Sequence, residues 1–167
     1  MMQSFQMAES AFDQRRLREV LGRFPTGITI VTSWSAETGR PVGLAVSSFN
    51  ALSLDPPLVL WSIGLKSSSL HAFRAHDYFA VNVLASDQQH LCDRFGRSGP
   101  DKFGGLDYDA GIGGVPLLRG AAAQFQCRTV GRHLQGDHEL YIGEVLALDS
   151  SSSDPLVFHG GLFRQLQ

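Results

Sequence analysis

The chain has 167 residues, of which 43% are hydrophobic and 18% charged, and we expect one globular domain over residues 1–167. A formal net charge of -2 excludes functions that depend on a basic surface, so we expect no nucleic-acid partner and no membrane partner. Cys92 and Cys127 lack disulfide or metal-ligand spacing, the histidines form no HExxH pair, and no signal-peptide pattern opens the sequence. These features predict free thiols, no metal site and a cytoplasmic location.

The first predicted element is a helix over residues 11–23, after a flexible start at residues 1–10. Ser10 and Asp13 have the residue types and spacing of a helix cap. Apolar side chains at helical spacing predict one apolar face, made of Leu17, Val20, Leu21 and Phe24. Pro25 and the two residues after it end this helix.

Three strands are predicted next, over residues 28–33, 42–49 and 58–63, and their order predicts an antiparallel meander. Where the second strand ends, a polar loop closes on two prolines at positions 56 and 57. Its hydrogen-bonding side chains are Ser47, Ser48, Asn50 and Ser53. Such side chains either satisfy turns or bind a ligand, and both interpretations stay open at this point.

A second polar segment, residues 66–69, joins one lysine to three serines ahead of a short predicted helix that ends near His76. Because the first N–H groups of a helix are free to bind anions, this segment is either a phosphate cradle or an ordinary cap. Residues 78–84 predict a strand. Ser86 and Gln89 then predict a capping box at the start of a helix that runs through Phe95.

Residues 96–116 contain too many glycines and prolines for a regular element, which predicts a long covering or connecting loop. Strands follow over residues 121–130 and 140–148, joined by a turn at residues 136–138, with short pieces near residues 156–158 and 162–166. About seven strands and three short helices predict a mainly β fold. A small closed antiparallel barrel with flanking helices fits this order, because closure removes exposed sheet edges.

Several segments taken in order resemble one known family. They are residues 25–32 (PTGITIVT), 43–57 (GLAVSSFNALSLDPP), 79–84 (FAVNVL), 101–103 (DKF), 116–118 (PLL), 136–138 (GDH) and 143–145 (GEV). This set is similar to the flavin reductase-like proteins of the FMN-binding split-barrel fold, which include the reductase components of two-component flavin-dependent monooxygenases. The resemblance covers nearly the whole chain, from residue 24 to residue 163.

The resemblance implies a homodimeric, six-stranded antiparallel split barrel of Greek-key type that binds FMN, or FAD in some members, between the barrel wall and the partner subunit. It implies hydride transfer from NADH or NADPH to the flavin, which then serves a separate monooxygenase. The implied flavin contacts are Pro25, Thr26, Ala45, Val46, Ser47, Ser48, Asn50, Ser53, Lys66, Ser67, Ser68, Ser69 and Phe103.

Near the nicotinamide the resemblance implies Asp137, Lys102 and His138, with His138 as the catalytic residue. An ordinary turn histidine and a surface loop anchored by Phe103 are the alternative interpretations of these residues. Two alternative functions stay open. One is a flavoenzyme that holds FMN tightly and acts directly on a small substrate, and the other is a non-catalytic flavin- or haem-binding barrel. The choices between NADH and NADPH, and between FMN and FAD, are left open by the motifs.

Overall fold

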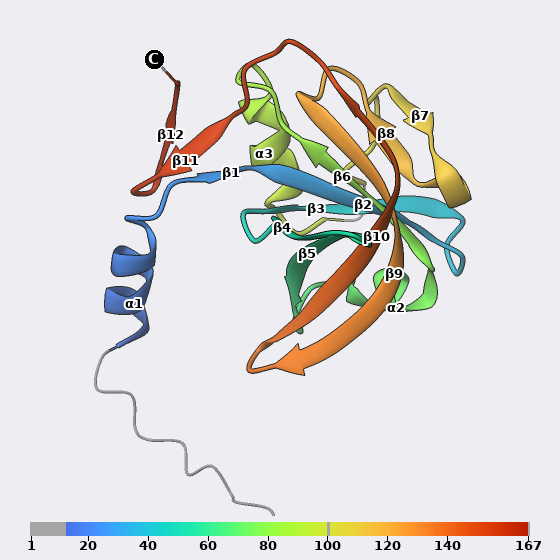
Figure 1. Cartoon of the computed structure of the whole chain (residues 1–167), viewed down its shortest axis with the longest axis horizontal. Helices are drawn as coiled ribbons and strands as arrows, with labels where there is room; N and C mark the ends of the chain where they lie inside the picture. The colour runs from blue at the N-terminus through green and yellow to red at the C-terminus, as the bar shows by residue number, and fades with distance from the viewer. Residues whose placement is uncertain (1–12, 100, 167) are drawn as a thin grey trace, which may run out of the picture.

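The computed structural model describes residues 13–99 and 101–166, and the predicted flexible start at residues 1–10, including Ser10, lies outside them (Figure 1). The helices are α1 (Gln14–Leu21), α2 (Leu70–Ala75), α3 (Gln89–Phe95) and the 3-10 helix η1 (Ile112–Gly114). The strands are β1 (Thr26–Gly27), β2 (Thr29–Ser35), β3 (Arg40–Val46), β4 (Asn50–Leu54), β5 (Pro57–Gly64), β6 (Tyr78–Val83), β7 (Tyr108–Ala110), β8 (Pro116–Leu118), β9 (Ala123–Gln135), β10 (His138–Ser150), β11 (Val157–His159) and β12 (Leu162–Arg164).

The main sheet has the order β3-β2-β6-β9-β10-β5-β4, and its neighbouring strands pair antiparallel. The predicted class, mainly antiparallel β with flanking helices, is confirmed, although this sheet has seven strands where six were expected. Of the predicted meander over residues 28–63, the antiparallel pairing of β2 with β3 is confirmed. The third strand, β5, does not pair with β3, because β3 lies at one edge of the sheet and β5 pairs with β4 at the other. Within the described residues the sheet curls but no strand pairing joins these two edges (Figure 1).

Both faces of the sheet carry buried side chains, as the alternation of side chains along β2 requires. On one face, the fully buried Trp61 ring contacts Phe73 of α2, Phe79 of β6 and Tyr141 of β10, with ring centroids 5.0, 5.6 and 4.9 Å away. On the other face, α3 packs Phe95 against β3 at Gly43. Each buried aromatic ring contributes about 1.5–3 kcal/mol to stability, so α2 and α3 are held firmly against the sheet.

The first helix differs from its prediction. It begins at Gln14, where the Asp13 carboxylate accepts a hydrogen bond of 2.7 Å from the Arg16 N–H, and it ends at Leu21 instead of residue 23. No residue of α1 is buried. With β1, β11 and β12 it forms an arm, residues 14–27 and 157–166, that stands away from the main sheet (Figure 1). The apolar face of α1 therefore faces solvent in a single chain.

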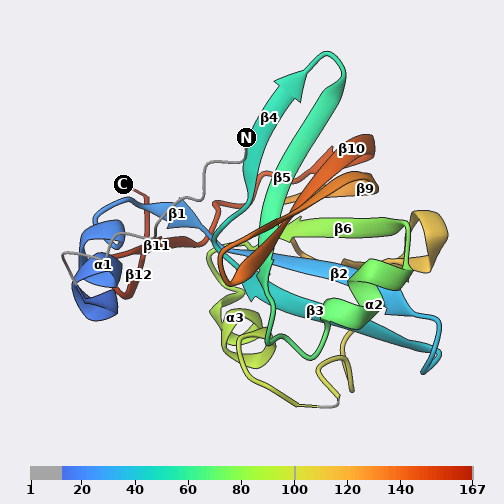
Figure 2. The ribbon, with the colours of Figure 1, turned by 90° about the horizontal axis from the view of Figure 1, so that it is seen from below.

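Three local predictions are corrected by the structure. The polar loop predicted over residues 47–57 contains β4, which forms with β5 a hairpin that projects from the body of the protein (Figure 2). No capping box forms at α3, because Gln88 is the cap residue and its side-chain oxygen accepts from the Ala85 N–H instead. The long loop predicted over residues 96–116 contains β7 and η1, and β7 pairs with β8. No helix of the described residues is long and apolar enough to cross a membrane.

Gly143 offers a test of the packing between β6 and β10. A Cβ atom at this position would lie 2.9 Å from Cε1 of Phe79 and closer still to its Cζ. We expect Gly143→Ala to lower the free energy of unfolding by about 1–3 kcal/mol, because the buried ring has to move. Urea unfolding measures this change. The control is Gly99→Ala, since a Cβ at Gly99 meets nothing within 4 Å, and an equal loss in both variants would contradict the account.

Candidate functional site

The site is built around one side chain, Ser48, which connects the segment after β3 to β5 on the opposite side of the main sheet. Ser48 follows the end of β3, and its Oγ donates a 3.2 Å hydrogen bond to the Ser62 carbonyl on β5. The Ser62 N–H donates back to the same Oγ at 3.0 Å. Since no strand pairing joins β3 to β5 in the described residues, these two bonds fix residues 45–48 against β5. We call this junction the seam.

The turn that follows β5 forms a second part of the site. The Ser67 N–H donates to the Gly64 carbonyl at 3.0 Å, and Ser67 Oγ accepts from the Ser69 N–H at 3.3 Å. Ser69 occupies the cap position of α2, but its side chain makes no capping hydrogen bond, so the predicted serine cap is only partly present. Lys66 and Ser68 are exposed. The turn therefore presents one cation and several polar groups to solvent.

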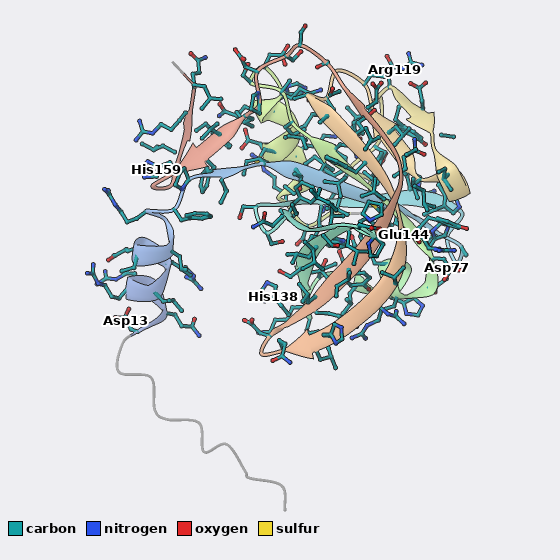
Figure 3. The ribbon with its side chains drawn as sticks, viewed as in Figure 1. Asp13, Asp77, Arg119, His138, Glu144 and His159 are labelled. Atoms are coloured by element: carbon teal, nitrogen blue, oxygen red, sulfur yellow. The ribbon has the colours of Figure 1, made fainter. Side chains whose placement is uncertain are left out.

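The β9–β10 turn lies beside that segment. His138 pairs with Gly64 across β10 and β5, and the Leu65 N–H donates to the Asp137 carbonyl at 2.9 Å. The Asp137 carboxylate lies 2.7 Å from His138 Nδ1. Figure 3 shows His138 at one end of β10. Asp137 and His138 therefore lie beside the turn that contains Lys66.

Electrostatics keep the Asp137 carboxylate charged. Its pKa is lowered by the hydrogen bond from His138, by the charge of that ring and, more weakly, by Lys66. A lowered pKa favours the carboxylate in the folded protein, so the contact is present above the ordinary pKa of aspartate and is lost only as the pH falls through the lowered value. The pair therefore persists on mild acidification.

A groove of about 540 Å³ extends the site along β3. It runs from Pro41 and Val42 to Ser68, Ser69 and His71. Because β3 leads from this groove to the seam, the groove and the segment at residues 45–48 are two ends of one strand. Ser68 and Ser69, predicted as phosphate contacts, thus line a groove at the beginning of β3, whereas Ser48 follows the end of that strand.

The remaining predicted contacts differ in burial. Ala45 and Val46 are half-buried, while Ser47 and Asn50 are exposed. Ser53 is half-buried on β4 and pairs with Leu58.

At the start of β1, Pro25 is exposed, and the half-buried Thr26 carries a buried Oγ1 without a hydrogen-bond partner among the described residues. A buried hydroxyl without a partner costs about 1–3 kcal/mol, so Thr26 is suited to a ligand that would supply the missing hydrogen bond.

Lys102 and Phe103 do not lie with the other predicted contacts at the seam, at the turn of residues 66–69 or at the pair Asp137–His138. Lys102 Nζ donates to the carbonyls of Gly43 and Phe95, at 3.3 and 3.1 Å, and burial lowers its pKa. Phe103 is buried, with edge-on contacts to Phe95 and Tyr108 at 5.0 and 5.6 Å. Both residues anchor the glycine-rich segment to α3 and β3. A lysine just after a helix commonly binds its last carbonyls, and that signal was available in the sequence.

Ser62 is the residue that the sequence analysis missed. It is a serine within an otherwise apolar strand, L-V-L-W-S-I over residues 58–63, and this break in the pattern was the available signal. The fit to a flavin rests on the chemistry of the groups present: backbone and hydroxyl donors along the seam, the unpartnered hydroxyl of Thr26, and one lysine beside serines for a phosphate. The described residues contain no group of three metal-ligating side chains.

The seam generates a direct test. We expect Ser48→Ala to leave the Ser62 N–H without its partner, to speed hydrogen exchange at that amide and to lower stability by about 1–3 kcal/mol. Exchange measured by NMR reports the first effect and urea unfolding the second. Ser47→Ala is the control, because Ser47 is exposed and adjacent. Unchanged exchange at Ser62 in the Ser48 variant would contradict the assigned role.

Comparisons with known proteins show the family of this chain. The family model for the flavin reductase like domain matches residues 21–167. FMN reductase (NADH) SmoA of Agrobacterium fabrum is 44% identical over 151 residues, covering 90% of this chain and 85% of SmoA. The reductase subunit HsaB of a flavin-dependent monooxygenase from Rhodococcus jostii is 43% identical over 162 residues, covering 96% and 82%.

Among solved structures, a nitrilotriacetate monooxygenase component B homologue from Mycobacterium thermoresistibile superposes with a TM-score of 0.88 at 42% identity. The match covers 93% of this chain and 87% of that one. The family model covers most of the chain, the relatives are more than 40% identical to it, and the solved structure shares its fold. The chain belongs to the flavin reductase-like family.

Proposed function

We propose that this chain is a flavin reductase that transfers a hydride from a reduced nicotinamide nucleotide, NADH or NADPH, to FMN or FAD. The observation that carries the proposal is the meeting of three segments along β5: the seam at Ser48, the turn at residues 66–69 and the pair Asp137–His138. The names of the relatives support it, since one is an NADH-dependent FMN reductase and another is the reductase subunit of a monooxygenase. A separate monooxygenase is accordingly the proposed acceptor of reduced flavin.

In this proposal the residues bind and orient the two nucleotides. Residues 45–48, Asn50 and Ser53 would hold the flavin ring together with Pro25 and Thr26, and residues 66–69 would bind its phosphate. Lys102 and Phe103 are left out, because both are engaged in the fold. Phosphate suits residues 66–69 because a lysine charge and polar donors lie together there.

The bound flavin supplies the capacity to accept a hydride at N5. The chain orients the donor: His138 Nδ1 is held by the Asp137 carboxylate, which leaves Nε2 to form a hydrogen bond with the carboxamide of the nicotinamide. No strong general base is needed, which suits a site of serines, backbone groups and one histidine. Alignment and exclusion of water are the tasks left to the protein.

The proposal is tested with flavin-stripped protein, NADH or NADPH, and increasing FMN or FAD. We expect nicotinamide oxidation that saturates with added flavin, because the flavin is used as a substrate. The same titrations give both nucleotide preferences. Flavin binding without any oxidation of NADH or NADPH would contradict the proposal and favour a carrier.

His138 has its own test. We expect His138→Ala to raise KM for the nicotinamide nucleotide about tenfold, the cost of one hydrogen bond of roughly 1.4 kcal/mol, while the Kd of the flavin stays unchanged. Steady-state kinetics and fluorescence titration measure the two quantities. His133→Ala is the control, because His133 is an exposed histidine on β9. A selective loss of flavin binding would move His138 to the flavin side.

We also propose a homodimer, in which a second copy covers the arm. The apolar side chains of α1 and the residues after it, Leu17, Val20, Leu21 and Phe24, are between 42% and 72% exposed. On the same arm Leu162 and Leu166 are 56% and 60% exposed. Monomers rarely expose so many large apolar side chains in one region, and a second copy of this face would bury them.

Light scattering on a sizing column tests the dimer. We expect a mass of twice 18.2 kDa for the natural chain and a shift toward 18.2 kDa for Leu21→Ser, because the serine removes buried apolar area from the interface. The control is Leu134→Ser on β9, since Leu134 is 61% exposed and Leu21 62%. A natural chain that elutes as a monomer would contradict the proposal.

A cytoplasmic location is proposed on the cysteines. Cys92 and Cys127 are free, and burial raises the pKa of the Cys127 thiol to about 12. Free thiols are the usual state in a reducing compartment.

A further inference from the structure

Two grooves meet at the beginning of β3. The first is the groove of about 540 Å³ that contains Ser68, Ser69 and His71, and it reaches Arg40 and Pro41. The second, of about 320 Å³, lies on the other side of the same two residues and runs along residues 101–104 to Tyr108. Both volumes are in the range of small-molecule sites. Arg40 and Pro41 therefore line both grooves, next to Ser68 and Ser69 of the proposed phosphate position.

Arg40 lines both grooves, and its guanidinium group has no charged partner among the described residues. Its backbone pairs with Ser35, but among the described residues its guanidinium makes no ion pair or hydrogen bond. The acidic groups of the two grooves are engaged: the Glu37 carboxylate lies 3.6 Å from His71 Nε2, and the Asp101 carboxylate accepts from the N–H groups of Phe103 and Gly104. A free guanidinium binds phosphate oxygens in pairs, which suits a pyrophosphate.

The second groove has one aromatic wall. Tyr108 is half-buried there and is held edge-on by the buried Phe103. The Lys102 ammonium lines this groove but is occupied by two backbone carbonyls. A half-exposed aromatic ring beside polar backbone is a surface on which a purine base stacks.

We propose that Arg40 binds a pyrophosphate between the grooves and that the second groove takes the adenosine that follows it. This inference rests on the proposed function. FMN ends at its phosphate in the first groove, whereas FAD continues through a pyrophosphate to adenosine. The nicotinamide nucleotide carries the same adenosine diphosphate group, so the shared chemistry defines the subsite and the experiment distinguishes its source.

The experiment compares Arg40→Ala, Arg40→Lys and the control Arg15→Ala, a change at an exposed arginine on α1. Fluorescence titration gives Kd for riboflavin, FMN and FAD, and kinetics with FMN give KM for NADH. We expect Arg40→Ala to raise Kd for FAD about tenfold to a hundredfold, with Arg40→Lys intermediate, while riboflavin and FMN change less than about threefold. Tyr108→Leu, which keeps an apolar contact with Phe103, is expected to weaken binding of the same nucleotide as Arg40→Ala and to leave riboflavin and FMN unchanged.

The outcomes separate the possibilities. A loss confined to NADH supports the subsite and assigns it to the nicotinamide nucleotide. Equal losses for FMN and FAD overturn it, because Arg40 then binds only the flavin phosphate. No loss for any nucleotide also overturns it, while the proposed function stands as long as the natural chain binds and reduces flavin. If the natural chain binds no flavin, the proposed function itself fails.

Discussion

The crossing of the chain from one edge of the main sheet to the other, within residues 47–49, is the constraint on which the candidate site depends. Consecutive strands normally pair, but here β3 and β4 end up at opposite edges. The short link leaves a seam that strand pairing does not close, and the two hydrogen bonds between Ser48 and Ser62 hold it together. A junction of this kind leaves backbone groups of residues 45–48 outside the strand pairing beside serine hydroxyls, and such groups can hydrogen-bond a planar polar ligand.

The two cores fix what surrounds the seam. The ring cluster around Trp61 sets the position of β5 and β10 and holds α2 in place, so the turn at residues 66–69 and the pair Asp137–His138 cannot move independently. On the other face α3 packs against Gly43 and fixes β3, which leads from the groove at Ser68 and Ser69 to the seam. Rigid strands thus hold side chains that come from short, polar turns, an arrangement common in binding sites.

Sequence reasoning predicted the mainly β class, most strand positions and the family, because strand composition and short motifs are local properties. It was wrong where the structure depends on contacts between residues far apart in the sequence. The third strand of the meander was misplaced because nothing local indicates that β3 and β4 occupy opposite edges, and Ser62 was missed because its partner is fourteen residues away. The ligand contacts that the motif implies for Lys102 and Phe103 stay predictions, and in the structure hydrogen bonding and burial engage the two residues in the fold. Leu17, Val20 and Leu21 lie on α1 as predicted, but Phe24 follows the end of the helix, and the exposure of all four depends on the rest of the fold.

Hydrogen exchange with and without FMN tests the central claim most directly, because it locates the ligand without relying on activity. We expect slower exchange at the amides of residues 45–50 and 66–69 on adding FMN, with β7 and α1 unchanged at a constant oligomeric state. Protection confined to the groove between α2 and β9, lined by Arg74, Asp77 and Arg132, or no protection at all, would contradict the placement of the flavin at the seam.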